Sequence, residues 1–123
     1  ILLSGILSVS CANFFLSPSI NTVGNYNFLL NAFNQANIKV AVATNQSGIA
    51  RGYYSERDVI SLHDHIKNEL KCINAYIDEF FISPYHPDNT KDFLHLSHLR
   101  KPNTGMLDLA ASKWQIDKSQ SFL

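Results

Sequence analysis

A run of small polar residues follows an apolar stretch near the middle of the chain, and its residue types suit a phosphate site. Ile38–Ala43 is nearly free of charge and rich in β-branched residues, as expected of a strand buried on both faces. Thr44, Asn45, Gln46 and Ser47 then supply hydroxyls, side-chain amides and backbone N–H groups. Ligands of open α/β sheets bind at the carboxyl ends of the strands, so we predict a phosphate-sized polar site here.

Two cations follow later in the chain. Arg100 and Lys101 precede a proline and the sequence Gly105–Leu107. Fixed positive charges stabilise the oxygens of a phosphoryl group, and Lys101 could approach that group from a second loop. A pair of cations ahead of a proline is by itself an ordinary surface feature, but its order after the first polar run supports a shared site. Arg51 is interpreted as mainly structural, since it could as well anchor its loop as meet the substrate.

Together, Thr44–Gly52 and Arg100–Leu107 resemble motifs of the haloacid-dehalogenase-type phosphatases, closest to the heptose-bisphosphate and histidinol-phosphate phosphatase branch. The resemblance covers roughly Val23 to Leu123. It implies an α/β fold, a Rossmann-like parallel sheet flanked by helices, in a single domain over residues 1–123 that is truncated at the carboxyl end. It also implies hydrolysis of a small sugar phosphate, most notably D-glycero-D-manno-heptose 1,7-bisphosphate.

Within that resemblance, each polar residue receives a role. Thr44 and Lys101 would hold the phosphoryl group and Arg100 would take part in substrate recognition. The donors of Asn45 to Ser47 would complete the phosphate and substrate site.

The catalytic Asp-x-Asp pair that the resemblance leads us to expect is missing. With Ile1–Leu3 as the first strand, Ser4 and Ile6 occupy the two Asp positions, and the first Asp of the sequence is Asp58. Serine carries no carboxylate and isoleucine cannot transfer a proton. The final acidic motif would follow a strand that begins at Ser121–Leu123. Magnesium, the cofactor expected for the family, therefore lacks a complete site, and we expect the chain to be inactive or severely impaired.

Many heptose-bisphosphate members also bind a structural zinc, but the resemblance puts its ligands at four unsuitable residues of this chain. These residues are Ser83, Tyr85, Ser97 and Leu99. His86, His95 and His98 lie in the same stretch, and we expect them to be exposed loop histidines. Cys11 and Cys72 show no metal-type spacing. The sequence therefore predicts no zinc site.

The first half of the chain is expected to form a strand over Ile1–Val9, a loop over Ser17–Asn25 and a helix over Tyr26–Ala36. Apolar residues at intervals of three and four predict the buried face of that helix: Leu29, Ala32, Phe33 and Ala36. Asn37 is expected to end it.

The second half is expected to alternate helices and strands. Ser55 can cap a helix whose buried stripe comprises Val59, Leu62, Ile66 and Leu70. His63 and His65 on that helix are interpreted as solvated side chains that cannot share one metal. Glu79–Ser83 is expected to form a strand. A helix is expected from near Thr104, with an apolar set of Met106, Leu109, Ala110 and Trp114, followed by a turn at Gln115–Asp117.

The composition of the chain limits the classes of binding partner that we expect. Hydrophobic residues make up 46% of the 123 residues, and ten basic side chains balance ten acidic ones. A chain without net charge has no general attraction for nucleic acid or an anionic membrane, so phosphate recognition must be local. No apolar run reaches the roughly 20 residues needed to span a bilayer. We expect a cytoplasmic protein that binds a small phosphorylated sugar, without nucleic acid or membrane partners, and of an oligomeric state that the sequence does not fix.

Several interpretations stay open at this point. The chain is a fragment, the product of a damaged reading frame, or a non-catalytic pseudoenzyme that binds a sugar phosphate. A polynucleotide 3'-phosphatase-like fragment shares the Thr-Asn-Gln and Lys-Pro motifs, although the absence of net charge counts against it. An exported protein with a cleaved amino terminus is a weaker alternative.

Overall fold

A three-stranded parallel sheet lies at the centre of the fold. The computed structural model describes residues 5–7, 20–88 and 92–121, with only the backbone described for residues 5–7 and 20–27. Strands β1 (Gly5–Leu7), β2 (Val40–Asn45) and β3 (Glu79–Ser83) are ordered β1-β2-β3. Ile6 is opposite Ala41, and Asn45 is opposite Ser83. The expected α/β fold with a parallel sheet is confirmed.

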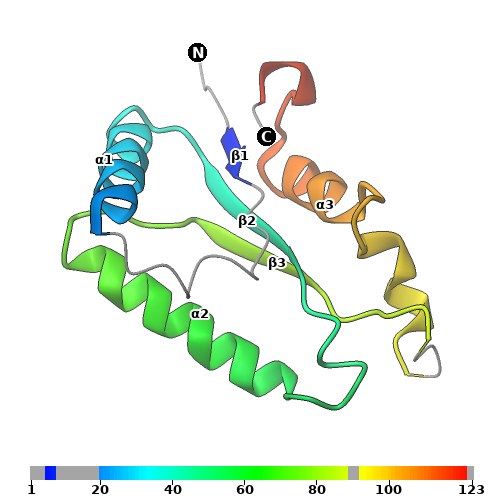
Figure 1. Ribbon diagram of the computed structural model, residues 1–123. Coiled ribbons are helices and arrows are strands. Elements are labelled where there is room, and N and C mark those ends of the chain that lie inside the picture. The colour runs from blue at the N-terminus through cyan, green and yellow to red at the C-terminus, as the bar shows by residue number, and fades with distance from the viewer. Residues whose placement is uncertain (1–4, 8–19, 89–91, 122–123) are drawn as a thin grey trace.

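Helices cover both faces of this sheet, as Figure 1 shows. α1 (Ile20–Gln35) connects β1 to β2, and α2 (Glu56–Lys71) connects β2 to β3. Both helices lie on one side because right-handed crossovers that proceed in the same direction along a sheet stay on one face. α3 (Gly105–Trp114) lies on the other side. Short 3₁₀ helices at Leu94–Leu99 and Lys118–Gln120 flank α3 in the chain.

The central strand β2 is buried along almost its whole length. Val40 to Thr44 are all buried, as the uncharged run before Thr44 predicts. On the α3 side, Ala41 packs against Ala110, while Ala43 packs against Leu99 and Met106. Small alanine side chains let α3 approach the sheet closely, which fixes the loop between β3 and α3 at the carboxyl end of β2.

α2 begins at the predicted cap. The Ser55 hydroxyl accepts a hydrogen bond from the backbone N–H of Asp58, and the Asp58 carboxylate accepts one from the Ser55 backbone N–H. This reciprocal pair satisfies two N–H groups that have no partner inside the helix. Val59 of the predicted stripe is buried and the other three members are half-buried, so the predicted orientation of α2 is confirmed.

The prediction for α1 is wrong in two respects. The helix begins at Ile20, so the expected loop is helical over residues 20–25. Leu29, Ala32 and Ala36 of the predicted apolar face are exposed, whereas Asn34 is buried. The reason is that Asn34 pairs with the backbone of Tyr76, whose N–H donates to Asn34 Oδ1 and whose C=O accepts from Asn34 Nδ2. A buried polar pairing, not apolar periodicity, sets the rotation of α1.

One further prediction about a side chain is corrected. His63 was expected to be solvated, but it is only 8% exposed and its ring stacks on that of Phe80 at 4.0 Å between centroids. His65 is exposed as expected. In the apolar set of α3, Met106 and Ala110 are buried, whereas Leu109 is 47% exposed. Gln115 has φ of 53°, and it ends α3 as predicted.

The first strand lies within the range expected for it, Ile1–Val9. It covers Gly5–Leu7, so Ile6 lies inside the strand and not at its carboxyl tip. The assignment of Ile6 to an acid/base position at that tip is therefore wrong, because it assumed a strand over Ile1–Leu3. Ser4 lies outside the described residues, as do Phe122 and Leu123 of the expected last strand. None of the helices in the described part of the chain is long and apolar enough to cross a membrane.

Candidate phosphate site

Lys101 is fastened to the carboxyl end of β2. Its backbone N–H donates to Asn45 Oδ1 at 3.0 Å, and its C=O accepts from Asn45 Nδ2 at 3.3 Å. The Lys101 ammonium donates to the backbone oxygen of Ala43 at 3.1 Å. Two residues that are 56 positions apart in the sequence are thus joined at one strand end. These contacts place Lys101 at the carboxyl end of β2.

Thr44 lies between Ala43 and Asn45, the two residues that hold Lys101, and is 1% exposed. Its hydroxyl oxygen accepts a hydrogen bond from Gln46 Nε2 at 3.2 Å, and Gln46 Oε1 accepts one from the Tyr54 hydroxyl at 2.8 Å. The backbone N–H of Gln46 donates to Ser83 of β3 at 2.8 Å. These bonds hold the first residues of the loop after β2 against the sheet.

Thr44 and Lys101 reach the strand end from different faces. Successive side chains of a strand point to opposite faces, so Asn45 and its Lys101 partner lie on the α3 side and Thr44 on the side of α1 and α2. A group that contacts both residues would sit beyond the end of the strand. Ser47 is half-buried at the start of the following turn.

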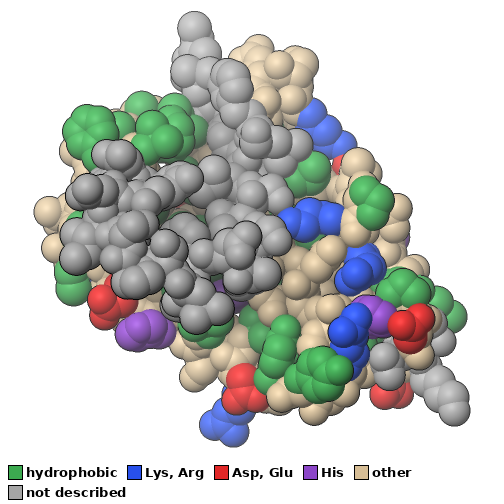
Figure 2. Space-filling view, viewed as in Figure 1, with side chains coloured by type: hydrophobic (Ala, Val, Ile, Leu, Met, Phe, Trp, Pro, Cys, Tyr) green, Lys and Arg blue, Asp and Glu red, His purple; other side chains and the backbone are tan. Residues whose placement is uncertain are grey.

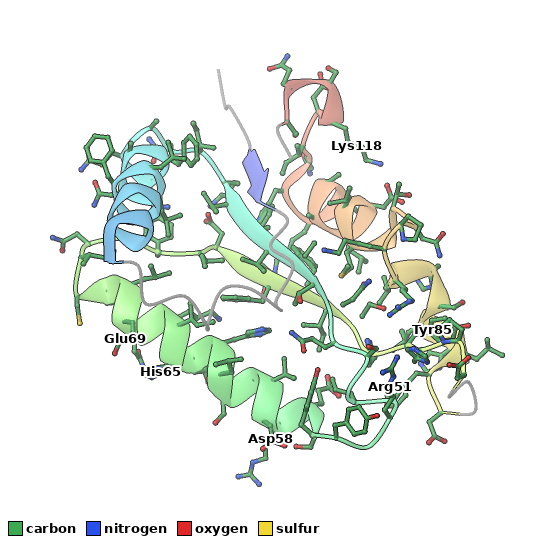
Figure 3. The ribbon with its side chains drawn as sticks, in the orientation of Figure 1. Arg51, Asp58, His65, Glu69, Tyr85 and Lys118 are labelled. Atoms are coloured by element: carbon green, nitrogen blue, oxygen red, sulfur yellow. The ribbon has the colours of Figure 1, made fainter. Side chains whose placement is uncertain are left out.

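Arg100 and Arg51 both contact the loop that follows β3. Arg100 Nη1 donates to the backbone oxygen of Tyr85 at 3.2 Å. The Arg51 guanidinium contacts His86 Nε2, and Figure 3 shows Arg51 directed toward the loop that carries Tyr85. His86 was expected to be exposed, but it is 8% exposed, because Arg51 and the backbone N–H of Asp88 cover its two ring nitrogens. That expectation is wrong for His86, whereas His95 and His98 are exposed.

Figure 2 shows several Lys and Arg side chains over α3 and the loops after β2 and β3, with Asp and Glu side chains among them. Lys113 pairs with Glu79 at the start of β3, and Lys118 pairs with Asp108 of α3. Positive charge at the carboxyl end of β2 is therefore supplied locally, by Lys101.

The donor set at the end of β2 suits an anion better than a metal. It consists of the Thr44 hydroxyl, the side-chain amides of Asn45 and Gln46 and the Lys101 ammonium. Magnesium prefers carboxylate and phosphate oxygens, and this set contains no carboxylate. Among the described residues, no three His, Cys, Asp or Glu side chains come together in a way that could hold a metal ion. The described residues at the end of β2 therefore do not fit magnesium.

Of the four residues at the expected zinc positions, two are buried and two are half-buried. Ser83 is 0% exposed, and its hydroxyl has no hydrogen-bond partner among the described residues. Leu99 is buried against Ala43 and Met106. Tyr85 and Ser97 are half-buried. An apolar contact at Leu99 and the bond from Arg100 to Tyr85 hold this loop to the sheet.

Two residues of the site were not among the predicted ones. Tyr54 bonds to Gln46, and His86 contacts Arg51. A signal for Tyr54 is present in the sequence, since Gly48 removes the side chain that would collide with it: a Cβ on Gly48 would lie 2.3 Å from the Tyr54 ring. Nothing local distinguishes His86 from the other histidines of its loop.

The chain belongs to the haloacid-dehalogenase-type phosphatases, in the family described as polynucleotide kinase 3 phosphatase, whose family model matches residues 20–123. This confirms the resemblance that Thr44–Gly52 and Arg100–Leu107 indicate.

The chain is similar in sequence to several heptose-bisphosphate phosphatases. The chain is 40% identical over 91 residues to D-glycero-beta-D-manno-heptose-1,7-bisphosphate 7-phosphatase of Rhodopseudomonas palustris, which covers 73% of this chain and 51% of the relative. It is 40% identical over 86 residues to the alpha-anomer enzyme of Photorhabdus laumondii, covering 69% and 47%. The chain thus spans about half the length of the relatives it matches.

Solved structures share the fold. A protein of Mesorhizobium loti described as a HAD-like phosphatase superposes with a TM-score of 0.78 at 26% identity, over 98% of this chain and 61% of the other. The D,D-heptose 1,7-bisphosphate phosphatase of B. bronchiseptica, solved with magnesium and phosphate, gives a TM-score of 0.68 at 24% identity. The match covers 92% of this chain and 65% of that one.

Proposed function

We propose that this chain is the phosphate-holding part of a sugar-phosphate phosphatase and that, by itself, it binds a phosphorylated sugar without hydrolysing it. The observation that carries the proposal is the fastening of Lys101 to residues on both sides of Thr44. The Thr44 hydroxyl and the Lys101 ammonium both lie at the carboxyl end of β2, where they can bind the oxygens of a phosphoryl group. The names of the relatives support heptose 1,7-bisphosphate as the substrate class.

The absence of turnover follows from the residue types near β1. Residues 1–55 contain no Asp or Glu, so no carboxylate is supplied by β1 or by the segments on either side of it. An aspartyl-phosphate intermediate cannot form there, and removing a nucleophile costs about a millionfold in well-studied hydrolases. The chain would thus act as a non-catalytic binding module. A cytoplasmic location is part of this proposal.

Isothermal titration of the purified chain with inorganic phosphate and with heptose 1,7-bisphosphate tests the proposal. Lys101→Met should weaken binding about 10-fold to 100-fold, because a hydrogen bond to a charged group contributes about 1.5–3 kcal/mol. Lys71→Met is the matched control, since it removes the same charge from the exposed last turn of α2. Equal affinity of the wild type and Lys101→Met would refute the proposal.

A second candidate is a polynucleotide 3'-phosphatase-like fragment, which the description of the matching family favours. Competition separates the two. A 3'-phosphorylated oligonucleotide that displaces the heptose phosphate, when the same oligonucleotide without phosphate does not, would favour this second function.

A further inference from the structure

Two asparagines of this chain pair with distant peptide groups in the same way. In each pair, the side-chain oxygen accepts from a backbone N–H, and the side-chain NH₂ donates to the C=O of that same residue. Asn34 does so with Tyr76, at 2.8 and 3.0 Å. Asn45 does so with Lys101, at 3.0 and 3.3 Å. Only one of these pairs lies at the proposed phosphate site.

The pair at the site fixes a residue with a charged side chain. The backbone of Lys101 is held by Asn45, and its ammonium is held by the oxygen of Ala43. These contacts with β2 anchor residue 101 at both its backbone and the end of its side chain. A lysine is a flexible point charge, and it loses less freedom on binding an anion when it is already confined.

We propose that Asn45 is a positioning residue that acts through Lys101, and that its side chain is not a phosphate ligand. The inference rests on the proposed function, because it takes Lys101 as the phosphate-binding cation. It changes the role that the sequence suggests for Asn45, whose amide is directed to the Lys101 peptide.

The chemistry of the pair specifies asparagine. The Lys101 N–H needs an acceptor and its C=O needs a donor, and both must come from one short planar group. Aspartate has the same shape but only accepts, so it would keep the bond to the N–H and set a negative oxygen against the C=O. Alanine supplies neither group.

Chemical reactivity of Lys101 tests the inference without any ligand. Acetylation by an N-hydroxysuccinimide ester, followed by peptide mass spectrometry, reports how freely each ammonium reacts. We expect Asn45→Ala to raise the rate at Lys101 about three-fold or more, as loss of a pair of hydrogen bonds implies. The rate at exposed Lys71 in the same sample should not change.

Asn34→Ala is the matched control, since it removes the same kind of pair far along the chain from Lys101. Both alanine variants should lower the melting temperature, but only Asn45→Ala should raise Lys101 reactivity and weaken binding of inorganic phosphate. If Asn45→Ala does not fold, Asn45→Ser supplies both measurements, because its hydroxyl can retain one bond of the pair and adds no charge beside Lys101.

A double-variant cycle separates positioning from a general loosening of the fold. In the Lys101→Met background, Asn45→Ala should no longer change phosphate affinity, because there is no ammonium left to position. The inference is overturned if Asn45→Ala weakens binding equally in both backgrounds, or if Lys101 reactivity stays unchanged in folded Asn45 variants. If Lys101→Met itself leaves phosphate affinity unchanged, the proposed function fails, while the reactivity of Lys101 still decides the role of Asn45.

Discussion

Replacing Gly48 with alanine should destabilise the fold by displacing one aromatic ring. A Cβ on Gly48 would lie 2.3 and 2.4 Å from two ring carbons of Tyr54 and 2.7 Å from its hydroxyl oxygen, all closer than carbon and oxygen atoms approach. The backbone need not deform, because the colliding atoms belong to the far end of a side chain that is already 38% exposed. The Tyr54 ring should therefore swing away into solvent.

The cost can be worked out from what the ring loses. The hydrogen bond from Tyr54 to Gln46 is lost, worth about 1 kcal/mol, and the packing of the ring's covered part contributes about 1 kcal/mol more. Alanine recovers about 0.4–1 kcal/mol, because it restricts the unfolded chain more than glycine does. The net destabilisation should be about 1–2 kcal/mol. A backbone clash would cost more, at about 3 kcal/mol.

Urea unfolding of four proteins tests this reasoning: the wild type, Gly48→Ala, Tyr54→Ala and the double variant. With Tyr54 already removed, the alanine at position 48 should be neutral or stabilising by up to about 1 kcal/mol, so the effect of the same substitution reverses sign. An unchanged cost in the Tyr54→Ala background would refute the argument, since the collision would then be with something other than that ring.

Three other perturbations have defined outcomes. Ser55→Ala should lower the free energy of unfolding in urea by about 1 kcal/mol. Hydrogen bonds from the Ser55 side chain and backbone lower the pKa of Asp58 below 3.8, so the Asp58 carboxylate stabilises the fold above this pH. This stabilisation should be lost as the pH falls through the folded-state pKa, and the loss should be less steep in Ser55→Ala. Burial of the ring and, to a smaller extent, the charge of Lys67 lower the pKa of His63 below 6.5, so the stability of the fold should decrease as the pH falls through 6.5. In thermal unfolding, this decrease should be smaller in His63→Leu and unchanged in His65→Leu. Magnesium or EDTA should leave the phosphate affinity measured by calorimetry unchanged, and a magnesium-dependent increase would contradict the donor set described at the site.

Some of the fold could be predicted because local signals agree with each other. The uncharged run before Thr44 predicts a buried strand, and β2 is buried from Val40 to Thr44. Ser55 followed by Asp58 predicts a helix start, and both halves of the capping box form. In these cases, the information lies within a few residues of the chain, where period and capping chemistry operate.

The failures have one physical cause in common, which is a partner distant in sequence. The rotation of α1 depends on Asn34, whose bonds go to Tyr76. His63 is buried because Phe80 of β3 provides a ring to stack on. Periodicity records only how hydrophobic a side chain is, so it cannot detect a polar or aromatic partner 17 to 42 positions away.

The candidate site follows the same division. Its residue types and order indicate an anion site, and the family match confirms the class of protein. The role of Asn45 inside the site was not predictable, because the sequence indicates only that its side chain can donate and accept hydrogen bonds and not which distant group it pairs with. Strand alternation separates Asn45 from its neighbour: Thr44 and Asn45 point to opposite faces of β2, and Asn45 pairs with Lys101. Gln46, directly after the strand, bonds to Thr44. The period of two within the strand thus decides which side chain could contact a ligand and which one holds the residue that does.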